Sequence, residues 1–243
     1  MVLLCSTVAS AADRRVHRAV DLNANGHLSL VTHNGTISIT TWNQPRVDID
    51  ARIEPAQFSS NDDVDKVEVR VSGSGSDVRI ETNYDAIPER HNWFGGTNRE
   101  LPPVHYTISV PATASIDIAD HNAEVRVAGV QGDVRVNAHN GSIDLSQIGG
   151  ATSISAHNAD VRVAFSRFAR SSEIETHNGE IDIRMPAAAR FNVNAHGHHL
   201  DVNSDFPVVA SQLGRDEYVG NVNGGGPELR LTTHNGSVRL KRS

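Results

Sequence analysis

The chain has 243 residues, of which 38% are hydrophobic and only 5% aromatic, and 22 Lys and Arg stand against 29 Asp and Glu for a net charge of −7. This length allows one large all-β domain or two small ones. The basic residues form no cluster that could neutralise phosphates, which argues against a nucleic-acid partner.

Residues 1–12, MVLLCSTVASAA, combine an apolar run with small residues, as at the end of a secretory signal peptide. Because the basic start is missing, we interpret them as a truncated signal. The mature protein is then exported, to the periplasm, the outer envelope or the extracellular space. Leu4 before the single cysteine, Cys5, disfavours lipidation, and the mature chain would contain no cysteine for disulfides or metal sites. No later stretch is long and apolar enough to span a membrane.

Residues 13–111 form an N-terminal β region with one copy of a repeat, THNGTISITTW, followed by longer alternating strands such as RVDIDARI and VHYTISVP. We expect a β-meander that caps the repeats, because open strand edges invite aggregation. An irregular loop in this region carries Tyr84, Trp93 and Phe94. These aromatics are candidates for contact with a sugar or a partner; alternatively, they cover the end of the aliphatic core.

Residues 112–243 repeat a His-Asn step at positions 121, 139, 157, 177 and 234, with a His-Gly variant at 196, so the period is about 19 residues. Aliphatic residues lie three positions before each His and four and six positions after it, which predicts two short strands per period. This is too short for a βαβ unit and indicates one coil of a β-solenoid, continuous with the first region over 20–243. An antiparallel sandwich is the competing geometry.

The His-Asn steps are predicted to form tight corners, since Asn and Gly tolerate positive φ angles and stacked asparagines can bond one another. The corner residues are His33, Asn34, Gly35, His121, Asn122, His139, Asn140, Gly141, His157, Asn158, His177, Asn178, Gly179, His234, Asn235 and Gly236. Five positions after the His, the outward residues mostly alternate in sign: Arg126, Asp144, Arg162, Asp182, Asp201 and Arg239. Such pairs set the register of stacked strands more than they stabilise it.

The order of these segments, from THNGTISITTW through tandem HNG units to the closing GGGPELRLTTHNGSVRLKRS, resembles the bacterial "putative adhesin" family of β-strand repeats, a domain of unknown function. The resemblance covers roughly residues 25–242. It implies an exported or envelope-associated β-solenoid and brings no catalytic residues.

A column of stacked histidines raises the possibility of a metal site, with His196, His198 and His199 as the densest cluster. Stacking in a line suits tetrahedral zinc poorly, so we favour a structural role for the histidines and predict no metal or other cofactor. Protonated neighbours would repel one another, which predicts a fold that weakens below about pH 6.

Catalysis by the outward carboxylates Asp144, Asp160, Asp182 and Asp201 would need a close pair in a groove with one raised pKa. Because arginines alternate with them, a solvated charge ladder is the better interpretation, and no catalytic constellation is found. The sequence favours a non-enzymatic, adhesin-like interaction or cell-envelope scaffold whose partner is an envelope protein or a glycan. The alternative is a carbohydrate-binding or carbohydrate-cleaving β-helix protein.

Overall fold

The computed structural model describes residues 13–56, 61–88, 90–91, 97–98, 101–198 and 200–243. This part of the chain is all-β, as the sequence predicts, apart from the short helix α1 (Asn61–Lys66). Most strands join one 16-stranded sheet, whereas β5 (Arg90–His91) and β6 (Thr97–Asn98) pair only with each other. The strands of the large sheet are β1 (Arg14–Val31), β2 (Asn34–Trp42), β3 (Arg46–Ile53), β4 (Glu68–Asn83), β7 (Val104–Pro111), β8 (Ser115–Ala128), β9 (Val134–Ile148), β10 (Thr152–Phe165), β11 (Ser172–Asn178), β12 (Ile181–Met185), β13 (Phe191–Gly197), β14 (Asp201–Ser204), β15 (Val208–Leu213), β16 (Glu217–Val222), β17 (Glu228–Asn235) and β18 (Ser237–Arg242).

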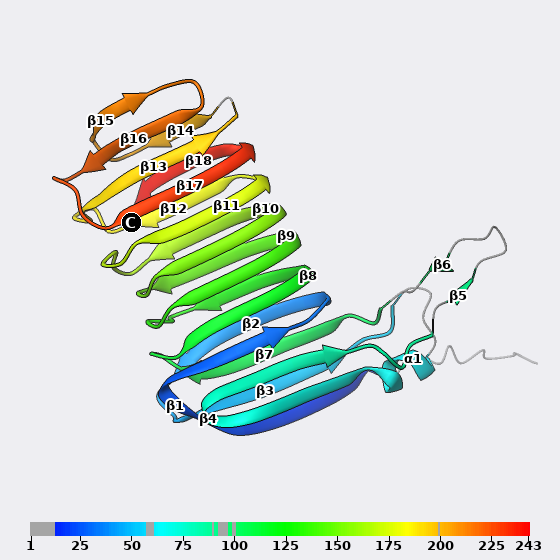
Figure 1. Cartoon of the computed structure of the whole chain (residues 1–243). Helices are drawn as coiled ribbons and strands as arrows, with labels where there is room; N and C mark the ends of the chain where they lie inside the picture. The colour runs from blue at the N-terminus through cyan, green and yellow to red at the C-terminus, as the bar shows by residue number, and fades with distance from the viewer. Residues whose placement is uncertain (1–12, 57–60, 89, 92–96, 99–100, 199) are drawn as a thin grey trace, which may run out of the picture.

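The tandem repeats stack as long, bent strands (Figure 1). Strands β8, β9 and β10 each pass through a His-Asn corner without interruption, which differs from the two short strands expected per repeat. The reason is that ladder pairing continues around the corner, where Asn122 aligns with Asn140 and Asn140 with Asn158. In the next copy the strand is divided at the corner, where Gly179, at φ 155°, lies between β11 and β12, and Gly236 likewise lies between β17 and β18 in the final copy.

The ladders between successive repeats are parallel and in register, unlike the antiparallel pairing that a sandwich needs. Val136 aligns with Ile118 on one side and with Ile154 on the other. Because equivalent positions superpose, each inward column is aliphatic from one strand to the next. The resulting core lies between the strand segments before and after the corners, and Ile118, Val136 and Ile154 are at most 2% exposed.

The spatial order of the repeats departs from the chain order at both ends (Figure 1). The first copy, β1–β2, pairs directly with β8, across an insertion of about 70 residues. At the other end, β17 pairs with both β11 and β13, so the last copy lies between the fourth tandem copy and the copy with the His-Gly step at 196, here called the degenerate copy. The outward series Arg126, Asp144, Arg162, Asp182, Asp201 and Arg239 assumed that the copies stack in chain order, and this assumption is wrong.

The N-terminal region is a mixed sheet and not the predicted meander. Strand β3 lies between β7 and β1 and runs antiparallel to both. Strands β4 and β7, in contrast, pair in parallel with β1 and β2 and so extend the stacked register by one more coil. The chain between Asn83 at the end of β4 and Val104 at the start of β7 therefore takes the place of a corner in this coil and is much longer than the corners of the other copies; this connection is here called the enlarged corner.

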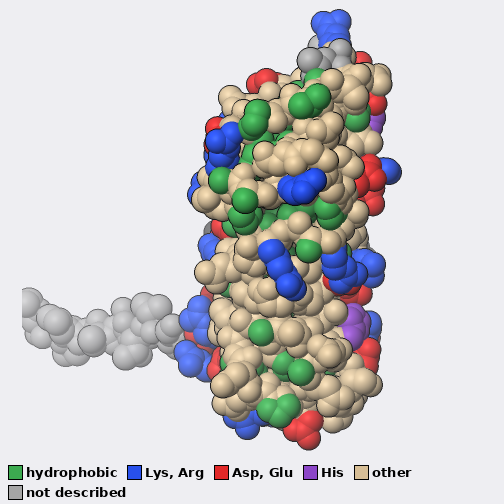
Figure 2. Space-filling model, turned by 90° about the vertical axis from the view of Figure 1, so that its left-hand side faces the viewer, with side chains coloured by type: hydrophobic (Ala, Val, Ile, Leu, Met, Phe, Trp, Pro, Cys, Tyr) green, Lys and Arg blue, Asp and Glu red, His purple; other side chains and the backbone are tan. Residues whose placement is uncertain are grey.

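The far end of the stack is covered by the antiparallel pair β15–β16, which continues the sheet from β13. Val209 on β15 is 68% exposed and is the one large hydrophobic side chain found exposed among the described residues. On the face seen in Figure 2, apolar side chains occur only in small, scattered groups between polar and charged ones. No helix in the described part of the chain is long and apolar enough to cross a membrane.

Candidate functional site: a histidine ridge and a polar groove

The six histidines of the His-Asn corners form a single column, here called the histidine ridge: His33, His121, His139, His157, His177 and His234. Successive ring centroids lie 4.7–5.0 Å apart with interplanar angles of 2–8°. This distance is the spacing of hydrogen-bonded strands. The ridge is therefore set by the backbone ladder, and each ring covers the face of the next.

An asparagine ladder runs beside the histidine ridge. Asn122 donates from Nδ2 to Asn34 Oδ1 (3.1 Å), Asn140 to Asn122 (2.7 Å) and Asn158 to Asn140 (2.9 Å). The same bond continues to the end of the column, from Asn178 to Asn158 and from Asn235 to Asn178, both at 2.7 Å. The asparagines thus bond from copy to copy. None of these asparagines has a positive φ. At the corners of this column, the residues with positive φ are Gly35, Gly141 and Gly179.

The ring geometry decides what the ridge can do chemically. Because the rings are nearly parallel, their in-plane nitrogen lone pairs are also parallel and do not converge on one point. A single tetrahedral ion needs converging ligands. Among the described residues, no group of three or more His, Cys, Asp or Glu side chains is placed to hold a metal ion.

The densest histidine cluster of the sequence, His196, His198 and His199, is only partly within the described residues. His198 lies beside the end of the ridge, 5.8 Å from His234 between ring centroids, whereas His199 lies outside the described residues. His196 is on β13, with Nε2 3.9 Å from a carboxylate oxygen of Glu217. The His-Gly step thus does not continue the ridge, and only the neighbouring His198 approaches it.

Acid has a direct electrostatic effect on the ridge. Two unit charges at this spacing repel by roughly 1 kcal/mol even in bulk water. Five neighbouring ring pairs share the column, so full protonation would place six positive charges in one line. The cost exists only in the folded protein, where the rings are held together.

A half-buried carboxyl group lies just inside the ridge. Asp120 occupies the inward position that Ala138 fills in the next copy, and both of its carboxylate oxygens are shielded from solvent. This burial raises the pKa of Asp120 to about 6, against the opposing effect of nearby backbone amides. The adjoining polar contacts include Thr82 Oγ1 donating to Thr32 (3.0 Å). The junction between the first copy and the tandem repeats is therefore one of the polar parts of a largely hydrophobic core.

The outward charges after the corners alternate more regularly than the chain order suggests. In the ladder, Arg126, Asp144, Arg162, Asp182 and Arg239 align in succession. Arg239 takes this place because the last copy lies next to the fourth tandem copy. Asp201 does not belong to the series, since it aligns with Ser237, and Asn203 stands opposite Arg239. Asp160, on a neighbouring outward column, accepts the backbone N–H of Glu180 (3.0 Å).

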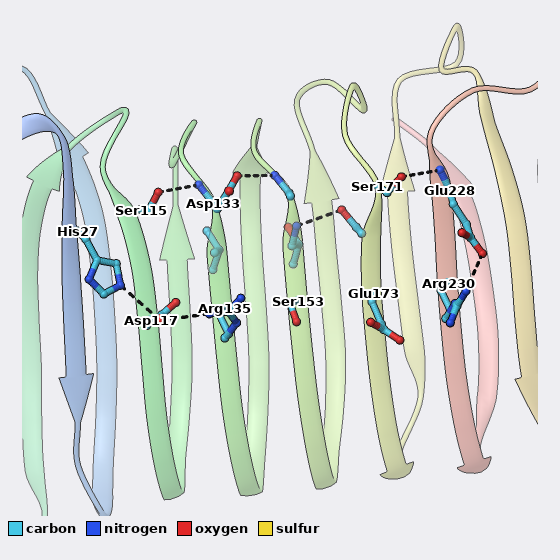
Figure 3. A pocket seen from close by; sticks show the side chains of 14 residues that line it. His27, Ser115, Asp117, Asp133, Arg135, Ser153, Ser171, Glu173, Glu228 and Arg230 are labelled. Atoms are coloured by element: carbon cyan, nitrogen blue, oxygen red, sulfur yellow. Dashed lines mark hydrogen bonds and ion pairs between the residues drawn. The ribbon is translucent and has the colours of Figure 1, made fainter.

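On the outward side of the strands before the corners, an open groove of about 560 Å³ crosses β1, β8, β9, β10, β11 and β17 (Figure 3). It is here called the polar groove. Its lining is made up of one or more residues from each strand and the turns that precede them: His27, Ser115, Asp117, Asp133, Val134, Arg135, Ala151, Thr152, Ser153, Ser171, Ser172, Glu173, Glu228 and Arg230.

Ion pairs fix both ends of the groove and leave its centre open. At one end, Asp117 lies between His27 (3.3 Å) and Arg135 (3.4 Å), and at the other Arg230 donates to Glu228 (3.3 Å). Between them Ser153 and Glu173 align on adjacent strands, and their side chains point out without a contact to another lining residue in Figure 3. The centre thus offers a hydroxyl group and a carboxylate to a ligand.

The rim of the groove is held by side chains that bond to backbone. Ser172 accepts the N–H of Thr152 (3.1 Å), and Ser171 accepts the N–H of Glu228 (3.0 Å). Asp133 accepts the N–H of Ala151 (3.1 Å) and contacts Arg170. These bonds tie consecutive turns together, so the groove is a preformed feature of the stack.

This groove was not predicted from the sequence, although the repeat contains a pattern that indicates it. The outward residues four positions before the histidines of the tandem and final copies are Asp117, Arg135, Ser153, Glu173 and Arg230, which form its floor. The sequence-based prediction considered instead the outward residues five positions after the histidines. Of the predicted aromatic contacts, Tyr84 is only 8% exposed and donates its hydroxyl to the carbonyl of Pro102 (3.1 Å), which suits a covering role. Trp93 and Phe94 lie outside the described residues.

Comparison with known proteins agrees with this architecture. The profile of the Toastrack DUF4097 family matches residues 22–241. The chain belongs to this family. The match confirms the resemblance drawn from the HNG units, and the matched residues cover nearly the whole chain. No curated protein matches it.

Solved structures include one described as a "putative cell adhesion protein" from Clostridium sporogenes ATCC 15579, with a TM-score of 0.60 and 14% identity over 96% of this Toastrack chain and 100% of that one. Another, a "putative adhesin" from Bacteroides fragilis NCTC 9343, has a TM-score of 0.37 and 11% identity over 96% and 99% of the two chains. The first likeness establishes a shared fold.

Proposed function

We propose that this Toastrack protein is an exported, non-enzymatic, adhesin-like interaction or cell-envelope scaffold that presents the polar groove to a partner. The observation that carries the proposal is the groove itself. Outward polar side chains from six strands stand in register, and their turns are tied together by hydrogen bonds. A preformed surface loses little conformational entropy when it binds.

The architecture that we propose for this role is a β-solenoid with coils of about 19 residues, continuous over 20–243. Its N-terminal part, 13–111, includes the enlarged corner, and 112–243 holds the tandem copies. Residues 1–12, proposed to be the remnant of a signal peptide, lie outside the described residues. Parallel, in-register ladders between equivalent positions support this description.

The partner is proposed to be an envelope protein or a glycan. The groove lining favours a polar ligand, because it contains four serines, four carboxylates and two arginines and only small apolar residues. Glycan binding is the second candidate, supported by hydroxyl and carboxylate groups that recur at the strand spacing along the groove. Glycan cleavage is less well supported, since an acid catalyst needs a raised pKa. The carboxyl group for which burial raises the pKa clearly, Asp120, does not line the groove.

The test is a glycan array and a panel of purified envelope proteins, probed at pH 7.5 with the full chain and two double variants. Ser153→Arg with Glu173→Lys fills the centre of the groove and inverts its charge. Ser155→Arg with Glu175→Lys makes the same changes two residues further along the same strands, outside the groove lining. We expect the first variant to lose at least tenfold in affinity and the second to bind like wild type. A wild-type protein that binds nothing, or equal binding by both variants, contradicts the proposal.

A further inference from the structure

The histidine ridge plays no part in the proposed groove contact, and its geometry indicates a second site. We infer that the ridge is an acid-activated binding site for an acidic polysaccharide, which it contacts through a line of protonated ring edges. This inference is independent of the groove, because the two surfaces share no residue.

The accessible part of the ridge is the edge of each ring. His121, His139, His157, His177 and His234 are exposed, yet their faces are covered by the neighbouring rings. Sugar rings stack on aromatic faces, so a neutral sugar finds no platform along the column. The parallel lone pairs equally disfavour a shared metal ion. What the edges do present is a row of ring N–H groups.

Protonation makes this row a linear cation. Each ring then carries one positive charge and two N–H donors, and the charges repeat every 4.7–5.0 Å over roughly 24 Å. A polyanion relieves the repulsion between them and releases its own counterions. By linkage, a ligand that binds the charged form also promotes proton uptake by the protein. A polysaccharide with one carboxylate per sugar presents its charges at a comparable repeat, which matches the ridge better than an isolated anion does.

The surroundings of the ridge leave one side open to such a ligand. Two positions before the histidines, the outward residues are small or polar (Ala119, Asn137, Ser155 and Thr232), with a carboxylate only at Glu175. On the other side, beyond the asparagine ladder, lie Glu124, Asp160 and Glu180. Glu124 contacts Arg126, and Glu180 pairs with Arg239 (2.6 Å), so two of these three carboxylates are already balanced.

The remaining polar and titratable neighbours are at the ends of the column or beneath it. Tyr84 approaches His33 edge-on at 6.4 Å between ring centroids, and His198 extends the column beyond His234. Asp120 lies beneath the first rings with its carboxylate oxygens shielded from solvent. The middle rings, His139, His157 and His177, are therefore farthest from these end groups and from Asp120, and their nearest carboxylates are Glu175 and Asp160 on opposite sides of the ridge.

The experiment is calorimetric titration of the full chain with sodium polygalacturonate, and with neutral dextran as a control ligand, at pH 5.5 and 8.0 and low salt. We expect at least tenfold tighter binding of polygalacturonate at pH 5.5, with net proton uptake shown by different heats in two buffers, and no binding of dextran. The triple variant His139→Gln, His157→Gln, His177→Gln should lose this binding and the proton uptake. His17→Gln, an exposed histidine (61%) outside the ridge, should keep both.

A second variant covers the case in which the triple variant does not fold. Asn137→Glu with Ser155→Glu keeps every histidine and adds carboxylates to the open side, as Glu175 does naturally, so it should weaken binding at pH 5.5 at least tenfold. Equal wild-type affinity at both pH values, or full binding by either ridge variant, overturns the inference. The groove variant Ser153→Arg, Glu173→Lys should keep the acid-activated binding, so failure of the groove proposal and failure of this one are distinguishable.

Discussion

The tandem repeats and the N-terminal region reach the same stacked geometry by different chain paths. In the tandem repeats, a short turn returns the chain, so the next copy in sequence is the next in space. The first copy instead meets β8 after the insertion that contains β3, β4 and β7, yet His33 lies on His121 at 4.7 Å and 8°, like His121 on His139 at 4.8 Å and 5°. The comparison shows that two copies become neighbours in the stack because their inward and corner residues match, and not because they are close in sequence.

The largest effect should come from the corner glycines, which test whether both regions use the same corner. A Cβ on Gly141 would lie 2.0 Å from the carbonyl oxygen of Ala123, and one on Gly35 would lie 2.1 Å from that of Val104. Both residues also have positive φ. Gly141→Ala and Gly35→Ala should each destabilise the protein by about 3 kcal/mol or more in urea unfolding. Gly214→Ala, where the nearest atom is 3.7 Å away, is the control and should change stability by less than about 1 kcal/mol. A mild effect at Gly35 alone would show that the N-terminal corner differs.

Acidification should have the next largest effect and should act on both regions, because the ridge joins them. Repulsion of roughly 1 kcal/mol per neighbouring charged pair predicts a melting temperature several degrees lower at pH 5 than at pH 7.5. Replacing His139, His157 and His177 by Gln should remove most of this dependence. A wild-type melting temperature that does not change between these pH values contradicts this prediction.

The asparagine ladder gives a smaller, graded test. Asn140 takes part in two side-chain bonds of the ladder, whereas Asn235 makes only the one to Asn178. Asn140→Ala should cost about 1–3 kcal/mol and Asn235→Ala about half as much, as measured by urea midpoints. Equal costs would mean that the ladder bonds contribute little beyond the corner conformation.

The smallest effect is a gain of stability at the junction between the two regions. The pKa of Asp120, raised to about 6, lies above its unfolded value, so the folded protein favours the protonated carboxyl group. The associated stability is complete below about pH 4 and is lost as the pH rises through 6. Asp120→Ala, which introduces the residue found at position 138, should therefore raise the melting temperature at pH 7.5 by a few degrees and have little effect at pH 4. A gain of the same size at both pH values would assign it to packing instead of ionisation.

Local pattern was sufficient to predict the all-β class, because the alternation of apolar and polar residues acts over a few positions. The order of the copies was not predictable from spacing alone, since β13–β14 (191–204) and β17–β18 (228–242) have similar lengths and either could follow β11–β12. His196 differs from the other copies in lacking the Asn that carries the ladder, and this was the available hint. The N-terminal meander was wrong because β4 and β7 satisfy the parallel columns of β1 and β2 instead of pairing with each other.

The groove was missed for a related reason. Its residues are ordinary on a single strand, and only the register that aligns Ser153 with Glu173 and Glu173 with Arg230 brings them into one surface. The ridge, in contrast, repeats one uncommon residue type, so its column could be inferred from the spacing.

The position of the final copy has a consequence for synthesis. Strand β13 hydrogen-bonds to β16 and β17, and β14 to β18, so the degenerate copy has no template in the stack until residues 228–242 have left the ribosome. The nascent chain can add the tandem copies one after another. The nearly forty residues that follow them, from β13 to the start of β17, can join the stack only after β17 and β18 have been synthesised and have paired with β11 and β12. A stop codon shortly before residue 228 would consequently leave the degenerate copy without its docking strand, although every residue of that copy would be present.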